Sequence, residues 1–180
     1  MKKFILIALL APVLLLGCQP KEGSCNIMSV MLDEDFFPGR VHAEPIDSPI
    51  PDAPPESAER IFLVKTDFST DVVQMDIMNF MSGETASNFW EREEKQIFRT
   101  DSYRGQWKTP EKLADLNLAP DQSHLACGVV LSNATCRWLA RYQGYYVYLR
   151  ADTSEHGVSE DVFLNAVKEI DSRMTQCIDD

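Results

Sequence analysis

The feature that most constrains the fold of this chain is a pair of alternating segments on either side of Gln143-Gly144. Residues 136–142 and 145–151 alternate between the two faces of a pleated strand, with a period of two. A two-residue connection containing glycine is typical of a tight hairpin, because glycine readily adopts a positive φ. This turn predicts three apolar pairs that face the core: Tyr142 with Tyr145, Ala140 with Val147, and Trp138 with Leu149.

The opposite face of the hairpin carries arginine and tyrosine. The same register pairs Arg141 with Tyr146, Leu139 with Tyr148, and Arg137 with Arg150. Both residue types are enriched at protein interfaces, where guanidinium groups stack on aromatic rings. We predict a partner-binding surface formed by Arg137, Arg141, Tyr146, Tyr148 and Arg150. The alternative is that a helix or the N-terminal segment covers this face and that the arginines pair with carboxylates.

Two more strands are predicted next to this hairpin, over residues 60–65 and 125–132, the second turned by Asn133-Ala134. Residues 71–81 fit two structures, because Val73, Met75 and Ile77 alternate like a strand while other apolar residues lie at helical spacing. We prefer the helix for this segment.

Three helices are expected after residue 84. One is capped by Thr85 and reaches Phe98, and a short one begins at Thr109-Pro110. The last is capped by Ser159 and runs to about Ile178. Its apolar side chains recur at spacings of three and four, which predicts a stripe packed on the sheet: Phe163, Ala166, Val167, Ile170, Met174 and Cys177.

The N-terminal part of the chain looks different. Residues 26–32 could form a short strand, and between Pro38 and Pro55 six of eighteen residues are proline, which excludes a helix or a central strand. We therefore expect a tether and proline-rich arm over residues 18–58 and a single domain over residues 59–180. The predicted fold class is α+β: an antiparallel sheet with the C-terminal amphipathic helix and one or two further helices packed on it, largely on one face.

The first seventeen residues have the plan of a secretory leader. Lys2 and Lys3 precede thirteen uncharged residues, too few to span a bilayer, and Gly17 then precedes Cys18. Leu15-Leu16-Gly17-Cys18 resembles the lipobox of bacterial lipoproteins. The resemblance implies cleavage after residue 17, lipidation of Cys18, and anchoring to a membrane through the N-terminal lipid. Gln19 in place of aspartate implies the outer membrane, on its periplasmic side.

The charge of the chain narrows the choice of partner. The chain carries a formal net charge of −11. Removal of residues 1–17 takes away two of the 17 basic residues, which leaves 15 against 28 acidic residues and a net charge of −13. Phosphate backbones repel such a protein, so we do not expect nucleic acid as a partner.

Lipidation of Cys18 leaves an even number of cysteines. Four cysteines in an oxidising compartment predict two disulfides, with three possible pairings. We favour Cys127–Cys136, which closes a short loop, and Cys25–Cys177, which ties the two ends together. The competing interpretation is a metal site of His124, Cys127 and Cys136, but its spacing is a weak metal pattern. We therefore expect no metal and no cofactor.

The sequence carries no catalytic signature. His42, His124 and His156 share no short motif with a nucleophile, and no phosphate-binding glycine loop occurs. The leading hypothesis is a non-enzymatic protein-binding module, either an immunity protein or an accessory factor of an envelope or secretion assembly. The alternatives are an envelope hydrolase that uses His124 or His156, and a purely structural lipoprotein.

Overall fold

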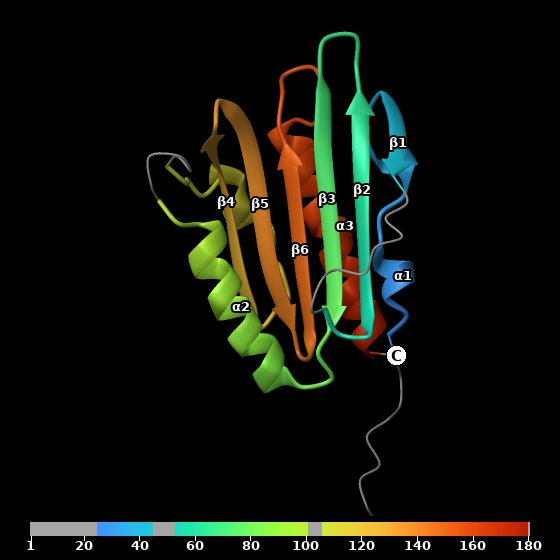
Figure 1. The fold of residues 1–180 in the computed structure, drawn as a ribbon, viewed down its shortest axis with the longest axis vertical. Coiled ribbons are helices and arrows are strands. Elements are labelled where there is room, and N and C mark those ends of the chain that lie inside the picture. Colours follow the sequence, from blue (N-terminus) through green and yellow to red (C-terminus); the bar gives the residue numbers. More distant parts are fainter. Residues whose placement is uncertain (1–24, 45–52, 101–105, 180) are drawn as a thin grey trace, which may run out of the picture.

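The computed structural model describes residues 25–44, 53–100 and 106–179. These residues form a six-stranded antiparallel sheet in the order β1-β2-β3-β6-β5-β4 (Figure 1). The strands are β1 (Arg40–Glu44), β2 (Glu56–Lys65), β3 (Thr70–Asn79), β4 (Gln122–Val130), β5 (Asn133–Tyr142) and β6 (Tyr145–Asp152). The predicted α+β class is confirmed, with helices packed on the sheet. Among the described residues, none of the helices combines the length and the apolar character needed to cross a membrane.

The β5–β6 hairpin has the register that the sequence predicts. Tyr142 pairs with Tyr145, and all the cross-strand pairs counted from that turn are present, through Arg137 with Arg150. The connection is Gln143-Gly144, with Gln143 at φ 52°. The apolar face of the hairpin is buried, because Trp138, Ala140 and Leu149 lie in the main core.

The turn between β4 and β5 lies two residues earlier than predicted. It consists of Leu131 and Ser132, both at positive φ, and not of Asn133 and Ala134, which begin β5. The register explains the difference, since Cys127 lies directly opposite Cys136 and the two are joined by a disulfide. A hairpin with this pair opposed has its turn midway between them.

Residues 71–79 are strand β3 and not the helix that we preferred. Val73, Met75 and Ile77 are buried in the main core, while the residues between them face the other side of the sheet. The strand wins because β3 pairs along its length with both β2 and β6. The backbone hydrogen bonds of a central strand outweigh an apolar spacing that fits a helix equally well.

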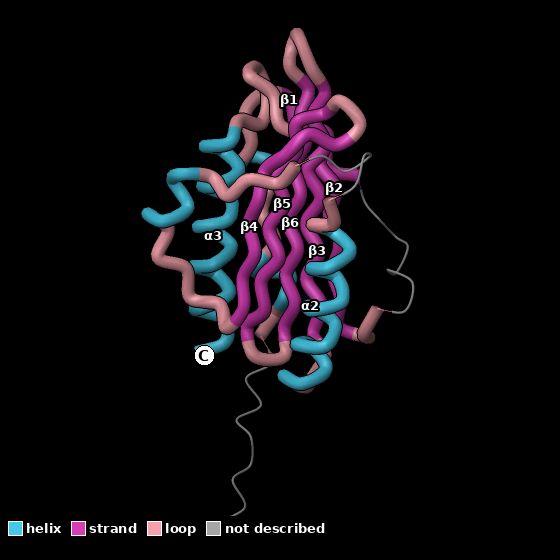
Figure 2. The backbone as a smooth tube through the Cα atoms, turned by 90° about the vertical axis from the view of Figure 1, so that its left-hand side faces the viewer, coloured by secondary structure: helices cyan, strands magenta, loops and turns pink. Residues whose placement is uncertain are grey.

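Helix α3 (Glu160–Asp179) packs on one face of the sheet, as expected (Figure 2). The Ser159 hydroxyl accepts a hydrogen bond from the Val162 amide, 3.3 Å away, and caps the helix. The predicted stripe enters the main core, with Cys177 packed at its margin. The buried Tyr142 hydroxyl donates to the Asp171 carboxylate over 2.6 Å and ties this helix to β5.

The segment before residue 33 is helical and not a strand. The Asn26 side chain accepts a hydrogen bond from the Met28 amide and starts the short helix α1 (Ile27–Val30). The three consecutive residues Val30, Met31 and Leu32 are all buried, which a half-exposed strand could not achieve. A disulfide joins Cys25 to Cys177 at the end of α3.

The folded domain therefore begins earlier than residue 59. After the single-turn η1 (Glu34–Phe36), strand β1 pairs with β2 from Arg40 opposite Lys65 to Glu44 opposite Ile61. This strand lies at the edge of the sheet, between two of the prolines of the predicted arm. Residues 45–52 of that arm lie outside the described residues, and its last three residues, 56–58, belong to β2.

Helix α2 (Gly83–Ile97) lies over β5 and β6 on the face of the sheet opposite α3 (Figure 2). The expectation that the helices lie largely on one face is therefore wrong, because each face of the sheet has its own apolar cluster to cover. Its cap is Ser82 rather than Thr85, because the Ser82 hydroxyl accepts a hydrogen bond from the Thr85 amide. Phe89 and Trp90 pack there on Met78, Leu139, Tyr146 and Tyr148, which form a second, smaller core. The short helix expected from Thr109 is the 3-10 helix η2 (Glu111–Asp115).

Candidate functional site

The cysteines are arranged as we favoured. Cys127 is bonded to Cys136 and Cys25 to Cys177. The alternative metal site is wrong, since the sulfurs of Cys127 and Cys136 are joined to each other and His124 Nδ1 lies 2.7 Å from Glu94 Oε1. Cys18, the leader over residues 1–17 and the rest of the tether to residue 24 lie outside the described residues.

The five residues of the predicted partner-binding surface do not form one exposed face. Helix α2 covers the middle of that face, so Tyr146 is only 3% exposed and Tyr148 only 9%. The three arginines contact groups of the chain itself. Arg137 donates to the Ile97 carbonyl and lies over the Trp107 ring, Arg141 pairs with Asp121, and Arg150 pairs with Asp152. Whether any of the five residues binds a partner stays a prediction.

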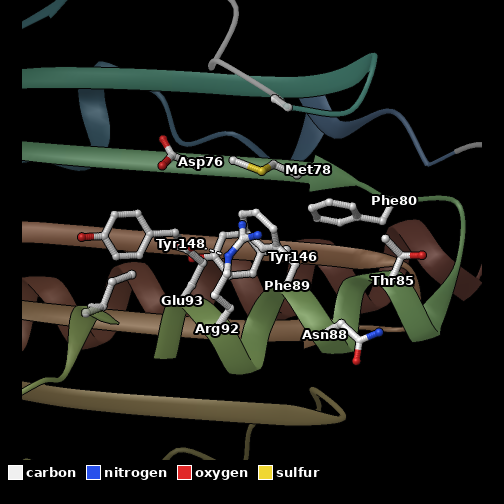
Figure 3. A pocket seen from close by; sticks show the side chains of 12 residues that line it. Asp76, Met78, Phe80, Thr85, Asn88, Phe89, Arg92, Glu93, Tyr146 and Tyr148 are labelled. Atoms are coloured by element: carbon white, nitrogen blue, oxygen red, sulfur yellow. Dashed lines mark hydrogen bonds and ion pairs between the residues drawn. The ribbon is translucent and has the colours of Figure 1, made fainter. Parts of the chain in front are cut away.

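The two tyrosines instead line a groove between α2 and the sheet (Figure 3). The groove has a volume of about 650 Å³, and most of its lining side chains come from three elements. Strand β3 contributes Asp76 and Met78, strand β6 contributes Tyr146 and Tyr148, and α2 contributes the opposite wall. We take this groove as the candidate functional site, because it is a concave surface that joins apolar side chains to a few polar groups.

Aromatic rings form one end of the groove. Phe80 and Phe89 lie 4.8 Å apart between ring centroids, and Phe89 meets the Tyr146 ring edge-on at 4.9 Å. The Arg92 guanidinium lies over the Phe89 ring at 4.7 Å and contacts the Glu93 carboxylate at 3.2 Å. The charge of Arg92 is thus already matched by its neighbour on the helix.

Asp76 lies near the other end of the groove and is the residue that sequence reasoning missed. Its side chain is 7% exposed, and it sits opposite Glu59 on β2 and Tyr148 on β6. Burial, with a smaller contribution from the charge of Glu59, raises the pKa of Asp76 from 3.8 to about 7, although a hydrogen bond from Gln74 opposes the shift. The Asp76 carboxyl therefore titrates near neutral pH.

The Asp76 carboxyl has no cationic partner among the described residues. Gln74 Nε2 donates to both of its oxygens, at 3.1 and 3.3 Å, and also to Glu59 Oε1 at 3.2 Å. One amide thus bridges two carboxyl groups from neighbouring strands. The sequence did contain a signal for Asp76, because it is an acid on the polar face of the alternating segment 71–81. That signal was missed because we preferred a helix for this segment.

The phenol groups of Tyr146 and Tyr148 add two more polar atoms to the groove. Burial is the main reason that the pKa of both phenols is raised. The charges of Arg137 and Arg150 oppose the shift at Tyr148, whereas the charge of Glu93 adds to it at Tyr146. Within the described part of the chain, neither hydroxyl has a hydrogen-bond partner. Both phenols stay protonated at neutral pH and can donate or accept one hydrogen bond.

The described residues that line the groove include no histidine, cysteine or serine. His124 stacks on Phe98 with ring centroids 3.9 Å apart, and His156 lies against Phe68. The lining combines apolar side chains, hydrogen-bonding groups and the Asp76 carboxyl, which forms no ion pair with the described part of the chain. This arrangement is suited to holding a side chain or a small ligand.

Comparisons of the chain with protein-family models, with curated proteins and with solved structures found no match.

Proposed function

We propose that this chain is a lipid-anchored envelope lipoprotein whose domain is a non-enzymatic protein-binding module facing the periplasm. The leader and Leu15-Leu16-Gly17-Cys18 support the anchoring, on the periplasmic side of the outer membrane. Two roles fit this proposal, an immunity protein and an accessory factor of an envelope or secretion assembly.

The observation that carries the binding role is the groove between α2 and the sheet. Its lining combines tyrosine, phenylalanine and arginine, the residue types that dominate the energetics of protein interfaces. Its two ends differ chemically, with aromatic rings at one and a buried carboxyl near the other. A groove of this kind accepts a side chain or a short segment of a partner in a defined orientation.

The charge of the molecule suggests the kind of partner. With a net charge of −11, or −13 without residues 1–17, the domain attracts basic surfaces and repels acidic ones. We therefore expect the partner to present positive charge to the groove.

The binding role can be tested by filling the groove. Asn88 lines it from an exposed position on α2, so Asn88→Trp should block entry without disturbing the core. Glu91→Trp is a matched control, because Glu91 is exposed on the same helix but does not line the groove. Proteins cross-linked to the chain in intact cells would be purified and quantified by mass spectrometry.

A partner of the groove should fall at least tenfold in Asn88→Trp and remain in Glu91→Trp, since one lost interface anchor can cost about 2 kcal/mol, near a thirtyfold change in affinity. Equal recovery from both variants would contradict the binding role of the groove.

The anchoring is tested separately with Cys18→Ser. The lipid is the proposed attachment, so this variant should move from the membrane fraction to the soluble fraction of lysed cells. Partition of the variant into detergent and membranes as in the wild type would contradict lipidation at Cys18.

A further inference from the structure

Among residues 25–44, 53–100 and 106–179, no basic side chain forms an ion pair with the Asp76 carboxyl. It is buried in the groove wall, and its hydrogen bonds within the described part of the chain come from the Gln74 amide alone. Burying an unpaired carboxylate is costly, and a neighbouring carboxylate, Glu59, makes it more so. A bound cation would remove both penalties at once.

The other polar atoms of the groove suit a ligand that only donates hydrogen bonds. The hydroxyls of Tyr146 and Tyr148 have free acceptor capacity, and Tyr146 is 3% exposed while lining the groove. Arginine offers five N–H donors and lysine three, and neither has an acceptor. Their apolar stems suit the Met78, Phe80 and Phe89 end of the groove.

An acidic ligand fits less well. Arg92 is the cation among the described lining residues, and its charge is matched by Glu93 at 3.2 Å. An incoming carboxylate would meet Glu93 beside Arg92 and would face Asp76 as well. The charges on the groove wall therefore favour a positive head group over a negative one.

We propose that the groove holds a basic side chain, arginine or lysine, of the protein partner, with its head group on the Asp76 carboxylate and its stem along the aromatic end. This inference rests on the proposed binding function and names the chemistry of its anchor. The Tyr148 ring, on the strand next to Asp76, offers a face on which a guanidinium can stack.

Binding should depend on pH, because the cation requires the ionised form of Asp76. Charged and titratable groups surround this carboxyl on every element packed nearby: Glu59 on β2, Tyr146, Tyr148, Arg150 and Asp152 on β6, Arg137 on β5, and Arg92 and Glu93 on α2. Arg150, which lies opposite Gln74, is paired with Asp152 at 3.0 Å. With a pKa of about 7, the ionised fraction rises from about one tenth at pH 6 to about nine tenths at pH 8. Affinity for a cation should therefore rise about tenfold over this range.

The test uses two probes of the same size. N-acetyl-arginine amide carries the guanidinium, and N-acetyl-citrulline amide replaces it with an uncharged urea of similar shape. Each would be titrated into the chain as purified from cells, and binding would be followed by the NMR shifts of groove residues. At pH 8 we expect the arginine probe to bind at least tenfold more tightly than the citrulline probe. Between pH 8 and pH 6 the affinity for the arginine probe should fall about tenfold.

Asp76→Asn should remove both the preference for arginine and the pH dependence, while Asp67→Asn, which deletes an exposed carboxylate in the β2–β3 turn, should keep them. Asparagine resembles the protonated acid, so this variant should fold.

Saturating arginine probe should also lower the titration midpoint of Asp76 in the wild type. Equal binding of the two probes, an unaffected Asp76→Asn variant, or preference for N-acetyl-glutamate amide would each overturn the inference.

These outcomes separate the inference from the proposed function. Capture of a partner that Asn88→Trp abolishes, together with probes that ignore Asp76, leaves the binding module standing and overturns the basic anchor. Probe binding through Asp76, together with partner recovery that Asn88→Trp leaves unchanged, supports the anchor chemistry and contradicts the groove as the partner site.

Discussion

Asp76 shows how much the environment of one residue can change its chemistry. The side chain belongs to a residue type that is normally charged at neutral pH, yet burial, with a smaller contribution from the charge of Glu59 on the adjacent strand, raises its pKa to about 7. The folded chain thus holds a proton in a pH range where the unfolded chain has released it.

This proton makes stability depend on pH. The folded pKa is raised, so the stabilisation by the protonated carboxyl is complete below about pH 4 and is lost as the pH rises towards 7. We expect the wild type to lose about 2–3 kcal/mol of unfolding free energy relative to Asp76→Asn between pH 5 and pH 8. Guanidinium unfolding at both pH values measures this difference.

Asp67→Asn serves again as the control, because it deletes an exposed carboxylate of the β2–β3 turn, and the stability of this variant should follow that of the wild type. Stability curves of the wild type and Asp76→Asn that stay parallel between pH 5 and pH 8 would show that the carboxyl is ionised throughout.

At the scale of the elements, local patterns succeeded where they determined the structure by themselves. Tyr142 and Tyr145 beside Gln143-Gly144 define the β5–β6 register, and the spacing from Phe163 to Met174 defines the buried face of α3. Both can be predicted because turn chemistry and periodicity act over a few residues.

Features that depend on distant segments could not be predicted in this way. The alternative structures of residues 71–81 have the same local pattern, and pairing with β2 and β6 decides between them. The covering of Tyr146 and Tyr148 depends on where α2 packs, which its own sequence does not show. The sequence pattern drew attention to Tyr146 and Tyr148, which line the groove, but it did not predict the groove itself.

The position of the β4–β5 turn could have been predicted from the sequence. The favoured Cys127–Cys136 pair, placed directly opposite, requires a turn at Leu131-Ser132. These residues have φ values of 50° and 79°, although neither type adopts this conformation readily. Leu131 is also largely exposed, so its replacement loses little packing.

We therefore expect Leu131→Asn combined with Ser132→Gly to stabilise the chain by about 1 kcal/mol, because Asn-Gly prefers such a turn. Thermal unfolding should shift upwards by about 3 °C. Gln143→Asn, beside the glycine of the other hairpin, is the comparison and should give a smaller gain. A decrease in the melting temperature of the double variant would mean that the turn is not strained.

At the scale of the whole molecule, the two disulfides differ in the length of chain that they close. Cys25 and Cys177 are 152 residues apart, whereas Cys127 and Cys136 are nine apart. In the chain-entropy treatment, removing the first with Cys25→Ser and Cys177→Ser costs about 5 kcal/mol, against about 3 kcal/mol for the second. Urea unfolding of the two double variants should show this order, and the reverse order would contradict it.

The Cys25–Cys177 bond also determines how far the domain can stand from its anchor. Seven residues lead from Cys18 to Cys25, and even a fully extended chain of that length reaches at most about 25 Å. The bond ties Cys25 to the end of α3, the same end of the sheet at which β3 ends and α2 begins (Figure 1). With a lipid on Cys18, the Phe80 and Thr85 end of the groove would lie towards the bilayer and Asp76 away from it. A partner would then have to reach the groove within a layer close to the membrane surface.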